Sequence, residues 1–375
     1  MTIKLLEKKF CHHQFQFTLI ENQSQLDDFL NLIFNSNLVA LDTEFERKNT
    51  YFPILSTIQI AVENSVKEKI IAIIDVLKGI DLSGLMAIIA NPKIVKIIHS
   101  GIQDLQIFYF SYKTYPQNIF DTQIIANFCG FDHNISLYNL VKNQCGVELN
   151  KAMQASDWIK RPLSPLQINY ALNDVLFLHD IYNNFNNILT AKQRVEWASE
   201  EMQDFIKNIF EKDIEHLIKK FSIRGLTKLQ ITKLYQILKL REEYAKSLNI
   251  NRENFIKNDI IYQIVLKNSV DVDLNLLNNN FAKELQKILA DDKIFLNLSE
   301  KIRFDDLQLA QYNKIKSIIS KSAKHEMIAP QFLVNNDKLK QIVIKKNSKE
   351  ILNNWRYFIL GDKIQKIFEI KIKNT

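Results

Sequence analysis

Cysteine, proline and glycine are all scarce in this chain of 375 residues, which contains 3, 6 and 7 of them respectively. The cysteines Cys11, Cys129 and Cys145 show no metal-site spacing, and their odd number leaves one thiol over in any pairing. This usage argues against a disulfide framework and is typical of a reducing compartment. We therefore expect a cytoplasmic protein.

Long apolar runs and several common catalytic motifs are absent as well. No run of about 18 or more apolar residues is present, so we expect no membrane-spanning helix. The N-terminal segment lacks a continuous apolar core and a small-residue cleavage site, so we expect no signal peptide. The patterns G-x-x-x-x-G-K-S/T, H-E-x-x-H, C-x-x-C and G-x-S-x-G do not occur. Their absence argues against P-loop, zincin, dithiol and serine-hydrolase chemistry.

Charge is distributed unevenly along the chain. Residues 1–210 contain 18 Lys and Arg against 22 Asp and Glu, a net charge of −4, whereas residues 211–375 have a net charge of +11. A basic segment suits a polyanionic partner such as nucleic acid, although a soluble basic domain without a partner has the same composition. The length of the chain favours two or three domains.

The first 130 residues alternate between strand and helix patterns. Apolar and β-branched runs predict strands at 15–20, 38–45, 56–63, 69–75 and 94–99. Helical spacing predicts helices over 24–34 and 85–90, and a third that begins at Gly101 and ends near Phe110. This succession predicts a mixed α/β sheet in which a meander of strands precedes a βα crossover.

From Asp121 onward the patterns are almost wholly helical. Asp121 suits a helix N-cap, and Ser164-Pro165 is a strong helix start with serine as the N-cap. The apolar pattern after that start continues to Ile181. The rest of the chain is predicted to form two helical modules, near 222–290 and 296–375, with linkers at 211–222 and Asp291-Asp292.

Two carboxylates stand at the end of a predicted strand in the stretch LVALDTEFER, residues 38–47. Residues i and i+2 of a strand point to the same face, so Asp42 and Glu44 project together. Two carboxylates this close repel each other unless a positive charge lies between them, and a divalent cation is the usual solution. In the simpler alternative, the strand ends there and both acids are solvated.

Three further side chains fall at structured positions. Asp104 lies one turn into the helix that follows strand 94–99. Tyr170 and Asp174 are four residues apart, which places them on one helix face. Each has an ordinary alternative: a solvated acid for Asp104, a core aromatic for Tyr170 and a backbone hydrogen bond for Asp174.

This ordered set of acids meets the needs of phosphodiester hydrolysis. That reaction requires an attacking hydroxide, charge relief on the phosphoryl oxygens and stabilisation of the leaving 3′ oxygen. Two divalent ions about 3.5–4 Å apart supply all three. Mg²⁺ retains several waters, so four carboxylates suffice for two ions, and a tyrosine hydroxyl can orient the water. We expect two Mg²⁺ or Mn²⁺ ions as cofactors.

Five segments resemble, in order, the DEDD exonuclease motifs of bacterial ribonuclease D, over about residues 15–200. They are LDTEFERKNTYFP, IQIA, HSGIQDLQIF, FDTQIIANFCG and SDWIKRPLSPLQINYALNDV. The tyrosine at position 170 resembles that of the DEDDy branch. The resemblance implies an RNase H-like α/β exonuclease domain, a mixed sheet flanked by helices, over residues 1–210.

The resemblance also implies the catalytic residues and their roles. The metal ligands are then Asp42, Glu44, Asp104 and Asp174, and Tyr170 positions the attacking water. Asp42 would bridge both ions, Glu44 and Asp174 would hold the ion that carries the nucleophile, and Asp104 would serve the other ion through water. The implied activity is 3′→5′ exoribonuclease, releasing nucleoside 5′-monophosphates, with tRNA 3′-end maturation as the family role.

The basic half resembles nucleic-acid-binding helical modules. GLTKLQITKLYQILKLREEYAKSLNINRENFIKNDIIYQIV (225–265) resembles an HRDC domain, and the segment ending LNNWRYFILGDKIQKIF resembles the second HRDC-like domain of ribonuclease D. The implied order is an exonuclease domain followed by two all-α HRDC-like domains, at 211–292 and 293–375.

We expect RNA as the partner, with tRNA precursors as substrates, no membrane and no protein partner. The oligomeric state is left open, and a monomer is compatible with the pattern. One alternative is a DNA-directed 3′→5′ exonuclease, since the sequence does not reveal a preference for the 2′-hydroxyl. Another is a catalytically inactive nucleic-acid-binding scaffold.

Overall fold

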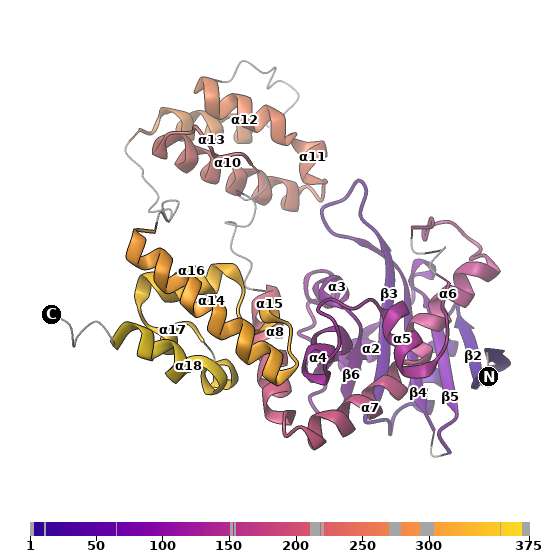
Figure 1. Ribbon diagram of the computed structural model, residues 1–375. Helices are drawn as coiled ribbons and strands as arrows, with labels where there is room; N and C mark the ends of the chain where they lie inside the picture. Colours follow the sequence, from indigo (N-terminus) through magenta and orange to yellow (C-terminus); the bar gives the residue numbers. More distant parts are fainter. Residues whose placement is uncertain are drawn as a thin grey trace.

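The computed structural model of the protein consists of an α/β part, which ends at Phe210, and an all-helical part that follows it (Figure 1). The structure describes residues 4–10, 13–64, 66–150, 153, 155–210, 218, 221–269, 279–292, 304–352 and 354–369.

The α/β part is built on one seven-stranded sheet. Its strands are β1 (Leu6–Phe10), β2 (His13–Ile20), β3 (Leu38–Glu46), β4 (Ile54–Glu63), β5 (Lys69–Asp75), β6 (Val95–Ile98) and β7 (Ile119–Asp121). They lie in the order β1-β2-β5-β4-β3-β6-β7. The pairs β1–β2, β3–β4 and β4–β5 are antiparallel, whereas β2–β5, β3–β6 and β6–β7 are parallel. The predicted mixed sheet is therefore confirmed.

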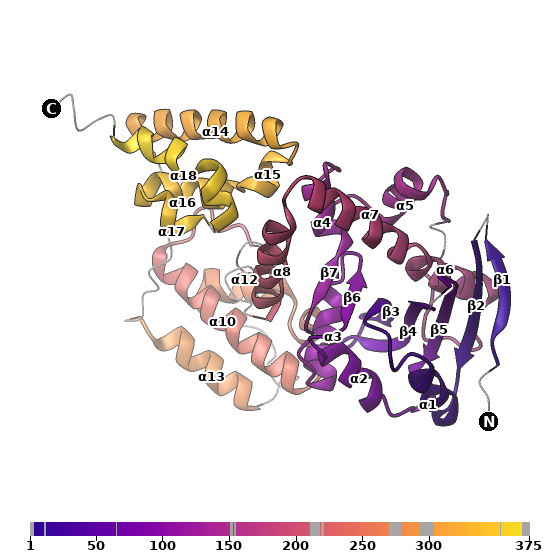
Figure 2. The same cartoon turned by 90° about the horizontal axis from the view of Figure 1, so that it is seen from below.

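Helices cover both faces of this sheet (Figure 2). They are α1 (Gln23–Leu32), a 3₁₀ turn η1 (Val76–Lys78), α2 (Ser83–Ala90), α3 (Ile102–Tyr112), α4 (Thr122–Cys129), α5 (Leu137–Cys145), α6 (Pro165–Leu176), α7 (Leu178–Ala191) and α8 (Val195–Phe210). In Figure 2, α1, α2 and α3 lie on one face and α4 to α7 on the other. All seven residues of β5 are buried, because a central strand covered on both faces is apolar throughout.

Three elements differ from the sequence-based expectation. Strand β1, LEKKF, was not predicted. It is a mostly exposed edge strand, and its charged residues do not give the alternation of apolar and polar residues that indicates a strand. Strand β7 was not predicted either, since three residues are too short to show alternation. The helix expected to run as far as Ile181 is divided at Phe177 into α6 and α7. The apolar spacing continues through the break, so the pattern could not reveal it.

The helices after Phe210 form two groups (Figure 1). The first helical group contains α10 (Lys228–Ser247), α11 (Arg252–Phe255), α12 (Asn258–Lys267) and α13 (Asn279–Ala290). The second helical group contains α14 (Asp306–Glu326), α15 (Pro330–Leu333), α16 (Asn336–Lys345), α17 (Ser348–Ile351) and α18 (Asn354–Glu369). The helical character predicted for this part of the chain is confirmed over the described residues.

The two helical groups differ in where they bury their apolar side chains. The first group has a core of its own, around Leu234, Ile237 and Phe281. The second group shares one continuous core with the α/β part. There the ring of Trp355 lies edge-on to that of Phe128, with 5.0 Å between centroids.

Several smaller expectations concern linkers and thiols. Asp291-Asp292 directly follows α13, as expected, whereas most of the predicted linker 211–222 lies outside the described residues. Cys129 and Cys145 are free thiols, and Cys11 lies outside the described residues. Among the described helices, none combines the length and the apolar character needed to cross a bilayer.

Candidate active site

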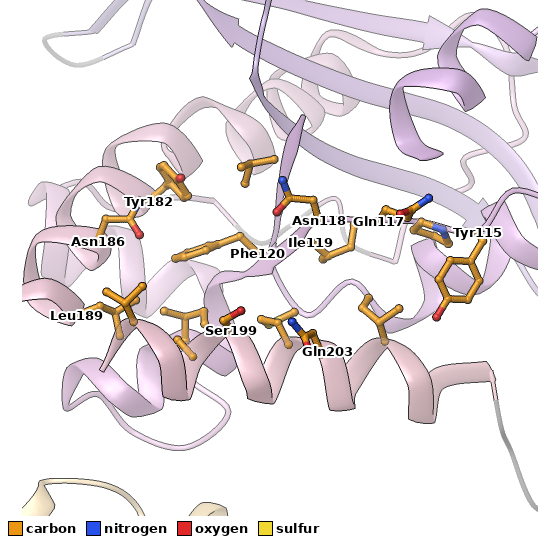
Figure 3. A pocket seen from close by; sticks show the side chains of 17 residues that line it. Tyr115, Gln117, Asn118, Ile119, Phe120, Tyr182, Asn186, Leu189, Ser199 and Gln203 are labelled. Atoms are coloured by element: carbon orange, nitrogen blue, oxygen red, sulfur yellow. The ribbon is translucent and has the colours of Figure 1, made fainter. Parts of the chain in front are cut away.

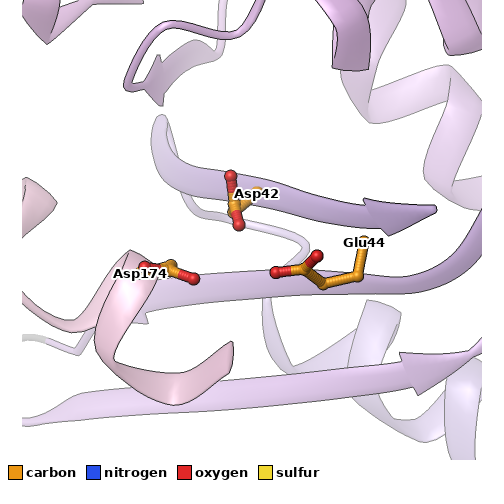
Figure 4. Close-up of side chains that lie close together, drawn as sticks. All are labelled: Asp42, Glu44 and Asp174. Atoms are coloured by element: carbon orange, nitrogen blue, oxygen red, sulfur yellow. The ribbon is translucent and has the colours of Figure 1, made fainter. Parts of the chain in front are cut away.

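Strand β3 carries the first two acids of the predicted site. It lies in the centre of the sheet, between β4 and β6, and is buried along most of its first half. Asp42 and Glu44 project from this strand toward a common space (Figure 4). The pairing with β4 shifts register between Glu44 and Phe45, so a bulge bends the strand directly after the second acid. A central strand with many ladder bonds fixes both carboxylates with little freedom.

Helix α6 brings a third acid to the same space. The helix starts at Pro165 with Ser164 as N-cap, and Ser164 and Gln167 form a complete capping box, which confirms the predicted start. Asp174 then lies opposite the two acids of β3 (Figure 4). One oxygen each of Asp42, Glu44 and Asp174 lie within 4.8 Å of one another. Tyr170, one turn earlier, donates a hydrogen bond from its hydroxyl to Asp174.

Asp104 adjoins this group without belonging to its tightest cluster. It lies in the first turn of α3, where a carboxylate is favoured by the helix dipole. Its Oδ1 accepts a hydrogen bond from the hydroxyl of Thr43, the residue between the two acids of β3. The structure therefore brings Asp42, Glu44 and Asp174 together directly and holds Asp104 beside them through Thr43.

Burial and mutual repulsion raise the pKa of all four carboxyl groups. Desolvation is the largest cause in each case. It raises the pKa of Glu44 to about 9 and that of Asp174 to about 8, with further repulsion from neighbouring carboxylates. The pKa of Asp42 is also well above its usual range, because Asp174, Asp104 and Glu44 all surround it. Burial raises the pKa of Asp104 to about 6, against the hydrogen bond from Thr43.

A positive charge placed among these groups would reverse the shifts. Four half-buried acids in one place are unfavourable unless they share protons or bind a cation. Hard divalent cations prefer carboxylate oxygens, so the donor set fits such ions. The burial of Tyr170 and the nearby Asp174 likewise raise the pKa of its phenol far above the ordinary value. This tyrosine is therefore a neutral hydrogen-bond donor.

A buried ion pair holds the segment before α6 against the sheet. Arg161 donates from Nε and Nη2 to the two oxygens of Asp75, at 2.7 and 2.8 Å. The same guanidinium also donates to the backbone carbonyl of Trp158. Asp75, at the end of β5, has only 1% of its surface exposed. These contacts position the start of the helix that carries Tyr170 and Asp174.

Sequence reasoning missed the supporting residues Thr43, Asp75 and Arg161. Arg161 lies inside the segment SDWIKRPLSP, but its partner Asp75 is 86 residues away, so no local sequence pattern indicates the pair. Asp121 is a helix cap, as interpreted: its carboxylate accepts from the backbone amides of Gln123 and Ile124. It also accepts from the amides of Ser100 and Gly101, which ties the start of α3 to α4.

A cavity of about 450 Å³ lies elsewhere, at the β7 edge of the sheet between α7 and α8 (Figure 3). Phe120, Tyr182 and Gln203 are among the side chains that line it, and none of the described lining residues is charged. It contains none of the predicted catalytic residues. The candidate active site is therefore the carboxylate cluster and not this cavity.

Comparison with known proteins identifies the family. A family described as "3'-5' exonuclease" matches residues 17–190. The chain is 30% identical over 372 residues to ribonuclease D of Bartonella henselae, a match that covers 94% of this chain and 90% of the relative. The chain belongs to the ribonuclease D family. The ribonuclease D of Haemophilus influenzae is 28% identical and covers 87% of this chain.

Solved structures support the fold. The crystal structure of Escherichia coli RNase D superposes with a TM-score of 0.76 at 22% identity, over 94% of this chain and 98% of that one. The catalytic core of RRP6 from Trypanosoma brucei gives a TM-score of 0.55 at 22% identity, over 73% of this chain and 78% of that one. The RNase H-like exonuclease fold followed by helical domains is thus confirmed.

Membership of the ribonuclease D family settles the kind of activity. The protein is a 3′→5′ exoribonuclease, as predicted. Exonuclease domains of this kind use divalent metal ions, and the cluster of Asp42, Glu44 and Asp174 supplies suitable ligands.

Proposed function

We propose that Asp42, Glu44, Asp104 and Asp174 hold two Mg²⁺ or Mn²⁺ ions, and that Tyr170 positions the attacking water. The proposed reaction removes nucleotides one at a time from the 3′ end of RNA and releases nucleoside 5′-monophosphates. The single observation that carries this proposal is the convergence of three carboxylates from β3 and α6 within 4.8 Å, with Asp104 beside them.

Bound divalent ions would supply charge relief on the phosphoryl oxygens and an activated water at neutral pH. The residues of the chain supply the rest. Asp42 and Glu44 come from a rigid central strand, so their positions change little when a cation binds. Tyr170 keeps its proton and already donates to Asp174, so its hydroxyl is fixed at the rim of the cluster. A neutral, oriented hydroxyl there is suited to hold a water by hydrogen bonding.

We further propose the division into an exonuclease domain at 1–210, a first HRDC domain at 211–292 and a second HRDC-like domain at 293–375. The separate core of the first helical group supports its reading as an independent module. The second helical group shares a core with the α/β part, which supports a role in packing against that part. The net charge of +11 over these modules favours contacts with RNA phosphates.

Maturation of the 3′ ends of tRNA is the proposed physiological role, since an enzyme that trims unpaired 3′ extensions is suited to that step. The chain's similarity to Escherichia coli RNase D, described as an exoribonuclease involved in structured RNA processing, supports a structured RNA as substrate.

The test uses the full-length protein and a 5′-labelled RNA with an unpaired 3′ tail. We expect a ladder that shortens from the 3′ end with Mg²⁺ or Mn²⁺ and disappears with EDTA. Asp42→Ala should abolish the ladder. Asp132→Ala removes an exposed acid outside the cluster and is the matched control, expected to leave the rate unchanged.

Undiminished cleavage by Asp42→Ala contradicts the proposed site. A DNA strand of the same sequence, offered in competition, decides between RNA-directed and DNA-directed activity. Bound but uncleaved RNA under both metals points instead to an inactive scaffold.

A further inference from the structure

The loop that follows the first two site acids touches the first helical group. This connector loop, residues 47–53, joins β3 to β4 and reaches toward α11 (Figure 1). The backbone amide of Asn251 donates to the carbonyl of Asn49 at 2.9 Å. The amide of Phe52 donates to Oδ1 of Asn249 at 3.0 Å. Residues about 200 positions apart in the chain are thus joined directly beside the active-site strand.

Glu242 of α10 is the central acceptor of this contact. The hydroxyl of Tyr51 donates to its Oε1 at 2.6 Å, and Nε of Arg252 donates to its Oε2 at 2.5 Å. The guanidinium of Arg252 also lies 5.0 Å from the centre of the Tyr51 ring, a cation–π contact. Only 15% of the Glu242 side chain is exposed. Its carboxylate is therefore already paired with Tyr51 and Arg252.

Arg47, the first residue of the connector loop, remains without a counter-charge. Its guanidinium makes no hydrogen bond or salt bridge with any residue that the structure describes. Partial burial and the repulsion of the nearby Arg252 lower its pKa, which identifies the two guanidinium groups as neighbours. Lys246 of α10 lies 5.6 Å from the ring of Phe110, and that ring lies 6.3 Å from the ring of Phe52 in the connector loop. Arg47, Arg252 and Lys246 thus lie around the contact, and Glu242, the carboxylate at its centre, already binds Arg252.

We propose that Arg47 binds a backbone phosphate of the RNA strand at the contact between the connector loop and the first helical group, with Arg252 and Lys246 contributing charge. A phosphodiester suits this place, because a guanidinium presents paired N–H donors that match two phosphate oxygens. Arg47 is three residues beyond Glu44, so its Cα lies on the order of 10 Å from the site along the strand. The assignment rests on the proposed function, which places the scissile bond at the carboxylates.

The phosphate that Arg47 binds must lie on the 5′ side of the scissile bond. A 3′→5′ exonuclease holds the terminal nucleotide in its site, so every other phosphate of the strand is upstream. A dinucleotide has one internal phosphodiester and cannot occupy both places. Loss of Arg47 is therefore expected to affect long substrates and to spare the shortest one.

The experiment compares Arg47→Ala with wild type on a ten-nucleotide RNA and on a dinucleotide. For the longer RNA, we expect KM to rise about 10-fold or more, the scale of a lost charge-assisted hydrogen bond, with kcat little changed. For the dinucleotide, both constants are expected to stay the same. Lys93→Ala removes an equal charge from an exposed position at the far end of β6 and is the matched control. An equal rise of KM on both substrates, or none on either, overturns the proposal.

Binding in EDTA gives a readout that is independent of catalysis. The affinity of wild type for the ten-nucleotide RNA is expected to fall with salt, and Arg47→Ala is expected to reduce the slope of log K against log salt concentration by about 0.7, the value for one contact to a single strand. This measurement tests the contact between Arg47 and a phosphate even if the proposed catalytic site is wrong. An unchanged slope contradicts the phosphate contact.

Tyr51→Phe separates the phosphate contact from the docking of the helical group. The variant keeps the ring and removes only the hydrogen bond to Glu242. We expect it to leave the salt slope at the wild-type value. If Tyr51→Phe lowers the slope as much as Arg47→Ala does, the salt dependence of RNA binding reflects the position of the connector loop. The guanidinium of Arg47 then does not bind the phosphate, and the proposal is wrong.

Discussion

The hydroxyl of Tyr170 hydrogen-bonds the carboxylate of Asp174 one turn further along α6, and Asp174 lies against the two acids of β3. This pair connects the neutral hydroxyl of Tyr170 with the cluster of carboxyl groups. It sits on a helix whose start is fixed by a complete capping box.

Tyr170→Phe is expected to lower kcat by about 10²-fold, the lower end of the range for a positioned proton-handling group, with little change in KM. The ring remains, so the packing near Trp158 is preserved. Single-turnover cleavage of a short RNA measures the effect. Tyr182→Phe, in the cavity at the β7 edge, is the control and should keep wild-type rates. A Tyr170→Phe rate equal to that of wild type contradicts a role for the hydroxyl.

Glu44→Gln is expected to stabilise the metal-free protein while abolishing activity. The pKa of Glu44 is raised to about 9, so this side chain must take up a proton when the protein folds at pH 7, which costs free energy. A neutral glutamine amide does not carry this cost. A gain of about 1–3 kcal/mol in the free energy of unfolding follows. Urea unfolding in EDTA measures it. Added Mg²⁺ should stabilise wild type more than the variant, because wild type binds the ion more tightly. Destabilisation in EDTA would sink this idea.

Asp75→Ala is expected to destabilise the protein by about 3–5 kcal/mol, because it leaves the guanidinium of Arg161 partly buried without its partner. The measurement is chemical denaturation. Lys142→Ala breaks the exposed pair with Glu148 and is the control, with an expected loss much smaller than that of Asp75→Ala, because solvent screens an exposed pair. Equal losses for the two variants would show that burial of the Asp75 pair has no energetic weight.

Glu201→Ala is expected to release the second helical group from α8. Glu201 accepts from both terminal nitrogens of Arg356, whose side chain is only 6% exposed. Hydrogen exchange should become faster in α18, while the exchange of β4 and β5 stays slow. A double-mutant cycle with Arg356→Ala measures the coupling, which we expect to exceed about 1 kcal/mol. Unchanged exchange in α18 means that the shared apolar core alone holds the group in place.

The buried histidine of α7 gives a pH dependence of stability. Burial, with a smaller effect of Lys69, lowers the pKa of His179 to about 4 from the ordinary 6.5. Between these values the unfolded chain binds the proton and the folded one does not. The free energy of unfolding is therefore unaffected by this histidine above pH 6.5. It decreases as the pH falls toward 4, by up to about 3 kcal/mol.

Unfolding free energies from pH 7 to 4 check this expectation. His179→Asn should reduce the fall in stability by the share of one histidine, whatever its effect on absolute stability, because His99, whose pKa burial also lowers to about 4, keeps its own share. His325→Asn changes a histidine that is 84% exposed and should leave the pH dependence as it is. A pH dependence that is the same in His179→Asn as in wild type assigns the proton uptake to other groups.

Much of the α/β part could be predicted from the sequence because its signals are local. The run KIIAIID is apolar throughout, and such a run fits only a strand that is covered on both faces. Asp42 and Glu44 share a face because alternation along a strand is a property of the backbone. Ser164-Pro165 fixed the start of α6, and the i, i+4 spacing placed Tyr170 beside Asp174.

Other features depend on partners distant in sequence and left no local trace. The hydroxyl of Thr43 that holds Asp104 is an ordinary strand side chain until α3 packs beside it. After the break at Phe177, α6 lies on β3, β4 and β5 whereas α7 lies on β3 and β6, and the break does not interrupt the apolar spacing. The core shared by the second helical group and the α/β part brings Trp355 onto Phe128 of α4 across 227 positions of sequence.

Residue spacing is enough to show which acids and which tyrosine are available, on which elements they stand and which face they share, because spacing along a strand or helix is set by backbone geometry. The approach of Asp174 to Asp42 and Glu44 within 4.8 Å, and the hydrogen bond that holds Asp104 to Thr43, follow from the packing of the folded chain. The same packing places Arg252 and Lys246 beside the loop that carries Arg47. These relations arise from the packing of distant segments, and packing depends on the whole chain.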